Sequence, residues 1–216
     1  MNLILKNSIE DYLKQINSDP DHRFTSWNHC FHAFQTEKDT DILALHLAFY
    51  LASWGMYRGS SSLLQKNYKV HIGAVTIIKR YQYLQCKQND FDVSKEQITD
   101  IIKLKNELKE YYKKQSYIKE GEKLVISPTD VLLSKIILGT LGCLPALDRY
   151  FLEGLKKNNI FISKITIKGL EQLFAFIEEN NSDIEEIRKE YLSNSNVYYP
   201  TMKIVDMFFW QRGLKK

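Results

Sequence analysis

Asp148, Arg149 and Tyr150 are the residues whose types and spacing best suit chemistry, because they follow one another shortly after Pro145. Proline is favoured at the first position of a helix, so Pro145 predicts a helix that runs to about Lys157. An acidic residue in the first turn often only compensates the positive end of the helix dipole. The alternative is a carboxylate held in one place for catalysis, with Arg149 and Tyr150 beside it to bind a substrate. We take Asp148 as the candidate catalytic residue.

A second polar group ends the most apolar segment of the chain, where Trp54, Tyr57 and Arg58 precede three consecutive serines. A buried arginine has to be paired, since an uncompensated buried charge is strongly destabilising. One interpretation is a polar pocket in which Arg58 meets Asp148 or an anionic ligand. The other is a helix end from which the arginine reaches solvent. Under the first interpretation, Trp54, Tyr57 and Arg58 are substrate-binding residues.

The segment from Ser127 to Tyr150 combines an apolar helix pattern, two glycines and the sequence Pro145-Ala146-Leu147-Asp148. This order resembles the stretch of helix-hairpin-helix DNA glycosylases in which the catalytic aspartate follows the second helix of the hairpin. The resemblance implies that Asp148 steadies an oxocarbenium-like sugar and activates water. It also implies that aromatic residues stack on an extruded base and that arginines bind phosphate or carboxylate groups. The aromatic candidates are Trp54, Tyr57 and Tyr150, and the arginines are Arg58 and Arg149.

The chain departs from those enzymes just before this helix. They carry a glycine-rich hairpin whose amides bind a DNA phosphate, whereas residues 124–129 here read LVISPT. No lysine occupies a clear nucleophile position there, and no four-cysteine cluster motif occurs. If the resemblance holds, the N-terminus of the helix at Ser127 would have to bind the phosphate, and the hydroxyl of Ser127 is predicted to cap this helix.

His29 and His32 share a helix face and could bind one metal ion, with Cys30 and His46 as further ligands. No acidic or cysteine partner lies at matching spacing, so the alternative of packing and surface histidines is preferred. Cys30 between two histidines could also be an activated thiol. Motifs of the common NTPases, dinucleotide enzymes, serine hydrolases and zinc peptidases are absent from the sequence. The sequence thus predicts no metal site and no cofactor.

Apolar spacing of three and four residues, with only four prolines and nine glycines, predicts an all-α fold. We expect one domain over residues 1–216 with about nine helices. Lys119-Glu120-Gly121-Glu122 is the best candidate linker, and a seam near residues 119–123 could divide two helical lobes. The one candidate strand is Phe161–Ile165. The helices are expected at 3–16, 26–34, 39–57, 68–86, 95–115, 127–139, 145–157, 166–179, 182–191 and from Pro200 onward.

Composition restricts the location and partners of the chain. Thirty basic and 26 acidic residues give a net charge of +4, which permits a nucleic-acid partner without requiring one. Three scattered cysteines suit a reducing cytoplasm. The longest apolar run, Ile42 to Met56, is shorter than the ~20 residues that span a bilayer, so we expect a buried core helix and no membrane partner. Two functions stay open: a protein that binds or acts on nucleic acid in the manner of a DNA glycosylase, and a non-enzymatic helical module that binds another protein.

Overall fold

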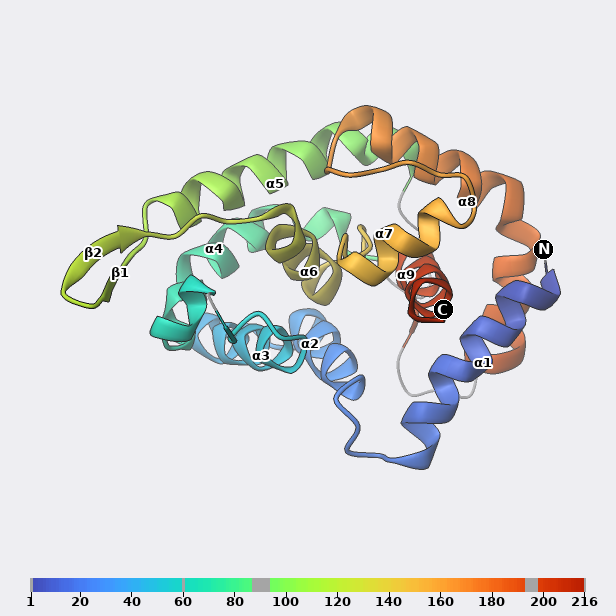
Figure 1. The fold of residues 1–216 in the computed structure, drawn as a ribbon, viewed down its shortest axis with the longest axis horizontal. Helices are drawn as coiled ribbons and strands as arrows, with labels where there is room; N and C mark the ends of the chain where they lie inside the picture. The colour runs from blue at the N-terminus through green and yellow to red at the C-terminus, as the bar shows by residue number, and fades with distance from the viewer. Residues whose placement is uncertain (1, 60, 87–93, 193–197, 216) are drawn as a thin grey trace.

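The computed structural model describes residues 2–59, 61–86, 94–192 and 198–215. Within these ranges the chain is predominantly helical and forms one compact domain, which confirms the all-α prediction (Figure 1). The α-helices are α1 (Asn2–Ser18), α2 (Thr25–Thr36), α3 (Thr40–Ser53), α4 (Ile72–Arg80), α5 (Ile98–Lys113), α6 (Asp130–Thr140), α7 (Arg149–Lys156), α8 (Ile167–Ile187) and α9 (Thr201–Leu214). Short helical turns are η1 (Ser62–Gln65), η2 (Tyr68–His71), η3 (Gln82–Leu84), η4 (Lys95–Gln97) and η5 (Arg188–Leu192), and the two strands are β1 (Ser116–Lys119) and β2 (Glu122–Val125).

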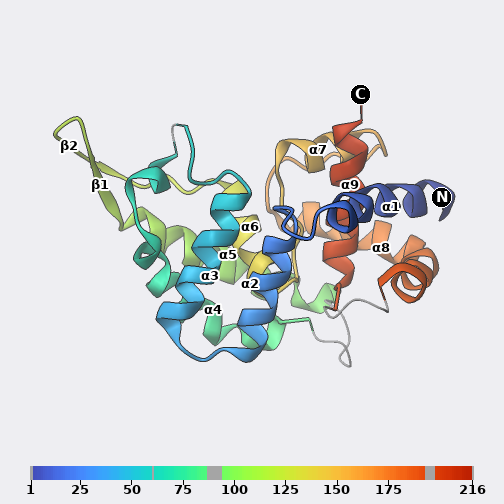
Figure 2. The same ribbon diagram turned by 90° about the horizontal axis from the view of Figure 1, so that it is seen from below.

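The helices form two groups that lie side by side (Figure 2). One group contains α2 to α6, and the other contains α1, α7, α8 and α9, so the first helix packs with the last ones. The backbones of α7 and α9 touch through two glycines. A Cβ atom at Gly154 would lie 1.9 Å from the carbonyl oxygen of Phe209, and one at Gly213 would lie 1.8 Å from that of Tyr150. Only glycine permits this crossing.

Helix α6 lies in the core, where every residue from Leu132 to Thr140 is buried. Gly139 allows the ring of Tyr50 on α3 to pack directly on the α6 backbone. The indole Nε1 of Trp27 on α2 donates a hydrogen bond to the carbonyl oxygen of Leu138 at 3.0 Å. α6 therefore fixes the relative positions of the helices around it.

Several helix starts agree with local capping chemistry. Asp39 caps α3 by accepting hydrogen bonds from the next amides, and Ser94 with Gln97 forms a capping box. The predicted cap at Ser127 is wrong by two residues, because the hydroxyl of Thr129 accepts the hydrogen bond from the amide of Leu132.

The helix predicted to begin at Pro145 begins at Arg149 instead. The amide of Ala146 donates to Asp206 at 3.0 Å and that of Leu147 to the hydroxyl of Ser134 at 2.9 Å. Because these amides bind side chains of α9 and α6, the residues after Pro145 are held outside a helix. Asp148 is thus the N-cap of α7 and not a residue of its first turn.

The residues predicted as a linker form the turn of a β-hairpin. β1 and β2 pair antiparallel, with Lys119 opposite Glu122. Glu120 and Gly121 both have positive φ values, 53° and 86°, as a two-residue type I′ turn requires. The hairpin extends from the end of the molecule, as Figure 1 shows.

Other boundaries also differ from the sequence-based expectations. Residues 161–165 are not a strand, and the helices expected at 166–179 and 182–191 are largely one helix, α8. The segment expected as one helix at 68–86 is divided into η2, α4 and η3. In the part of the chain that the structure describes, no helix is long and apolar enough to cross a membrane.

Candidate functional site

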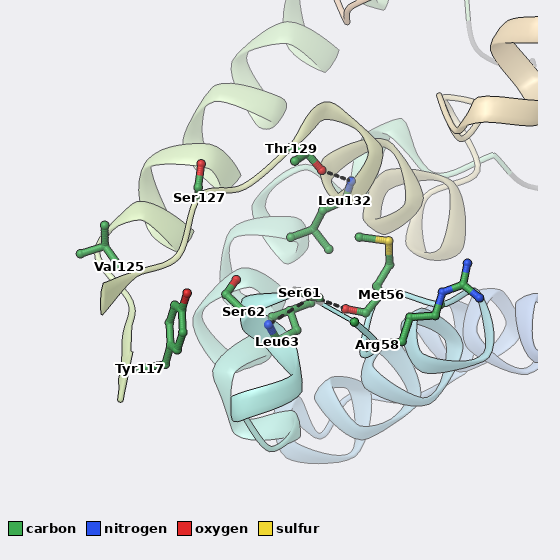
Figure 3. Close-up of a pocket in the computed structure, with 12 residues that line it drawn as sticks. Met56, Arg58, Ser61, Ser62, Leu63, Tyr117, Val125, Ser127, Thr129 and Leu132 are labelled. Atoms are coloured by element: carbon green, nitrogen blue, oxygen red, sulfur yellow. Dashed lines mark hydrogen bonds between the residues drawn. The ribbon is translucent and has the colours of Figure 1, made fainter. Parts of the chain in front are cut away.

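A hollow of about 540 Å³ opens between the hairpin and the segment that follows α3 (Figure 3). It brings together Arg58 and Ser127, two residues that the sequence predicted to bind substrate. Its lining is polar on several sides, and none of the described lining residues carries a carboxylate. The lining residues are Gly55, Met56, Arg58, Gly59, Ser61, Ser62, Leu63, Tyr117, Val125, Ser127, Thr129 and Leu132.

One wall is the loop from Gly55 to Leu63. Gly55 has a φ of 76°, and a Cβ atom there would lie 2.8 Å from Nε of Arg58, so the guanidinium folds over this glycine. The hydroxyl of Ser61 donates to the carbonyl of Met56 and accepts from the amide of Leu63, which closes the loop into a compact turn. The loop therefore holds Arg58 at one side of the hollow.

The other wall comes from the hairpin and the residues that lead into α6. Figure 3 shows Tyr117, Ser127 and Ser62 around the same side of the hollow. Asp130 is the residue after Thr129, but its carboxylate accepts a hydrogen bond from the amide of Ile165 at 2.9 Å. This contact accounts for the absence of Asp130 from the lining.

Tyr57 lies beside the hollow and anchors the Gly55–Leu63 loop to the helices behind it. Its hydroxyl is 2.7 Å from Nε2 of His71, and Nδ1 of His71 is 2.6 Å from the hydroxyl of Tyr112 on α5. Burial lowers the pKa of His71 to about 3 and raises that of Tyr57 to about 12. All three side chains are therefore neutral near pH 7, and the histidine donates one hydrogen bond and accepts the other.

Asp148 lies away from the hollow and is closely held by the protein. Its Oδ1 accepts from the amides of Tyr150 and Phe151 at 3.1 Å each, and its Oδ2 is 3.5 Å from Nζ of Lys135. The side chain is 15% exposed. Lys135 also donates to the carbonyl oxygen of Trp54 at 3.0 Å. Trp54 and Asp148 are thus joined through one lysine, whereas Asp148 and Arg58 are not brought together.

The sequence did not indicate a second buried ion pair, between Lys203 and Asp206 of α9, with a Nζ–Oδ2 distance of 3.0 Å. Nζ of Lys203 lies 5.1 to 5.6 Å from the ring centroids of Tyr12, Trp27 and Trp54. Burial raises the pKa of Asp206, and Lys203 opposes this shift. The available signal was a lysine and an aspartate three residues apart in a helix otherwise rich in aromatic residues.

Burial also acts on Lys135, the partner of Asp148. Desolvation lowers its pKa, while the nearby carboxylates of Asp148 and Asp206 oppose the shift. The Lys135 ammonium lies 5.7 Å from the Trp54 ring centroid. Among the described residues, the buried Nε1 of Trp54 has no hydrogen-bond partner. Together, the pairs Lys135–Asp148 and Lys203–Asp206 place two cationic and two acidic side chains in the interior between the two helix groups, where their charges largely neutralise one another.

The remaining predicted site residues lie elsewhere. Arg149 donates to the hydroxyl of Tyr150 at 2.8 Å and stacks over its ring, and Tyr150 packs edge-on against Trp210. His29 and His32 are exposed, whereas Cys30 is buried and burial raises the pKa of its thiol, the opposite of activation. Over residues 2–59, 61–86, 94–192 and 198–215, no group of three or more metal-ligating side chains occurs.

Comparison of this chain with models of protein families, with curated proteins and with solved structures finds no match. Function has to be inferred from the site itself.

Proposed function

We propose that the protein binds nucleic acid, with the sugar–phosphate backbone lying in the hollow beside Arg58. The observation that carries this proposal is the chemistry of the lining, whose described residues offer one guanidinium and five hydroxyl groups and no carboxylate. Guanidinium groups bind phosphate through paired hydrogen bonds. Serine, threonine and tyrosine hydroxyls commonly contact phosphate and sugar oxygens in protein–nucleic acid complexes. The hydroxyl groups belong to Ser61, Ser62, Tyr117, Ser127 and Thr129.

Four of these donors are available to a ligand. Within the described ranges, no hydrogen bond or ion pair engages the guanidinium of Arg58 or the hydroxyls of Ser62, Tyr117 and Ser127. An anion entering the hollow would therefore gain hydrogen bonds without breaking any inside the protein. Such net gains are larger for charged partners, at about 1.5–3 kcal/mol each.

Neighbouring cations favour a polymer over a small anion. Lys66 and Lys69 follow the loop that carries Arg58, and the segment from Trp54 to His71 contains no acidic residue. Lys123 lies on the hairpin. On the far side of Asp130, Lys164 and Lys168 line a second hollow of about 300 Å³, and among the residues described there none carries a carboxylate. A chain of phosphates could contact several of these cations, whereas one small anion could not.

We assign no catalytic step to Asp148 in this proposal. Its Oδ1 accepts two backbone hydrogen bonds and its Oδ2 faces Lys135, so the carboxylate already has protein partners on both oxygens. The glycosylase-like base release that the resemblance implies stays a prediction about Asp148.

Binding is tested by fluorescence anisotropy with labelled single-stranded DNA, duplex DNA and RNA over a range of salt concentrations. We expect Arg58→Ala to weaken binding about tenfold. It should also make the plot of log binding constant against log salt concentration less steep, by the amount that about one phosphate contact contributes. The matched control is Arg80→Ala, which removes an exposed arginine that pairs with Glu107 outside the hollow. Equal losses in the two variants, or binding that does not depend on salt, would refute the proposed site.

A further inference from the structure

Helix α3 exposes an apolar stripe on its outer side, although the sequence predicted a buried core helix. Its inner face is buried, but Ile42, Leu45 and Phe49 are 43%, 53% and 56% exposed. Spacings of three and four residues place these side chains in one row, which Ala52 continues. Figure 1 shows α3 next to α2 along the lower edge of their helix group.

An exposed row of large apolar side chains on a helix is unusual for a protein surface. Single exposed apolar residues need no explanation, whereas contiguous ones mark interaction sites. The row is also regular, straight and formed by one helix of 14 residues. These properties suit a second helix packed along it.

Charges at the two ends of the stripe indicate which helix this is. Asp41 lies in line with Leu45 and Phe49 at the N-terminal end and is exposed. Arg23 lies at the C-terminal end, where its guanidinium is 3.4 Å from the carbonyl oxygen of Ser53 and stacks over the Trp54 ring. An antiparallel copy of the same helix would place each Asp41 near the Arg23 of the other chain. The stripe is therefore complementary to itself.

We propose that two copies of this chain associate through antiparallel packing of their α3 helices. The interface is isologous, because each residue of the stripe meets the same stripe in reverse order around a two-fold axis. Ile42, Leu45 and Phe49 supply the buried apolar area, and the two Asp41–Arg23 pairs fix the direction. A single pair of short helices gives a small interface, so the dimer forms reversibly and depends on protein concentration.

Sedimentation equilibrium of the full chain from about 1 μM to about 500 μM tests the association. We expect the average mass to rise from one chain to two over this range. Phe49→Glu should weaken dimerisation more than tenfold, because it buries a charge in the interface. The control is Phe161→Glu, which alters a side chain that is 72% exposed outside the stripe and should leave the dimer unchanged. Circular dichroism checks that both variants are folded.

Charge exchange tests the antiparallel direction. Asp41→Arg and Arg23→Glu should each weaken the dimer several-fold, and the double variant should recover most of the loss because each pair is re-formed with reversed sign. Asp41 also accepts a hydrogen bond from Tyr68, and Arg23 also packs on Phe24, so each single substitution disturbs contacts within one chain. Recovery of dimerisation in the double variant would show that the losses come from the interface and not from these contacts. Three results would overturn the proposal. They are a monomer at every concentration, a dimer that Phe49→Glu does not weaken, and binding of the wild type to anionic lipid vesicles through this stripe in place of self-association. Nucleic-acid binding by Arg58 does not affect any of these outcomes.

Discussion

Replacing His71 with glutamine should make the protein less sensitive to mild acid. Glutamine has one donor group and one acceptor group, so it can keep hydrogen bonds to both Tyr57 and Tyr112 while removing the ionisable ring. In the wild type, burial lowers the pKa of His71 from 6.5 to about 3. The unfolded chain therefore takes up a proton below about pH 6.5, whereas the folded protein does not until about pH 3.

The difference between the pKa of His71 in the folded and in the unfolded protein sets the direction and size of the pH effect on stability. Protonation favours the unfolded state, so the contribution of His71 to stability is present above pH 6.5 and is lost progressively as the pH falls toward 3. The loss relative to pH 8 is about 1 kcal/mol at pH 6 and about 2 kcal/mol at pH 5. Its limit is on the order of 5 kcal/mol, a large part of the stability of an ordinary domain.

Urea denaturation of both proteins at pH 8, 7, 6 and 5 measures this contribution. Carboxylates and the other histidines titrate alike in the two proteins, so the difference between their pH profiles isolates residue 71. We expect the wild type to lose about 2 kcal/mol more than His71→Gln between pH 8 and pH 5. Parallel profiles would show that His71 is protonated in the folded protein as readily as in the unfolded one, and the neutral Tyr57–His71–Tyr112 chain would then be wrong.

Two further pairs of substitutions test the packing and the buried charges. Gly154→Ala should destabilise the protein by about 3 kcal/mol or more, because its Cβ atom would meet the backbone of α9. The control is Gly169→Ala, whose Cβ atom would lie 3.1 Å from a side-chain methyl of Ile162. This variant should change stability by less than about 1 kcal/mol. Similar denaturation midpoints for the two variants would contradict the backbone contact between α7 and α9. Asp148→Asn keeps a good N-cap residue but leaves the ammonium of Lys135 without its carboxylate, so we expect a loss of about 3 kcal/mol at pH 7 that adding Lys135→Met largely reverses. The folded Asp148→Asn variant, compared with wild type for base release from damaged duplex DNA, also tests the glycosylase-like prediction; release by wild type alone would assign catalysis to Asp148.

Local chemistry explains what the sequence could predict about the fold. Asp39 and the Ser94–Gln97 capping box act on amides within three residues, so their effect is readable from the sequence. The start of α7 was misplaced because the amides after Pro145 donate to Ser134 and Asp206, which are distant in the chain. The hairpin was missed because its turn begins with glutamate, an uncommon residue at a position with positive φ.

The candidate site was predictable only in part. Arg58 and Ser127 were selected by residue type, and they line one hollow because the hairpin approaches the loop after α3. Asp148 was selected by its place after Pro145, but its partner Lys135 lies on α6 and could not be assigned from spacing. The Lys203–Asp206 pair was missed for a similar reason: the aromatic rings that enclose it come from α1, α2 and the end of α3.

The packing of α1 against α9 has a consequence during synthesis. Tyr12 and Lys203, which meet in the folded protein, are separated by 191 positions, so α1 leaves the ribosome long before its partner is made. At about 5–20 residues per second this delay lasts roughly 10–40 s. The apolar side of α1, with Leu5, Ile9 and Tyr12, stays without its final partner during that time. Chaperones that recognise exposed apolar segments should therefore engage the nascent chain at α1 and release it when α9 emerges.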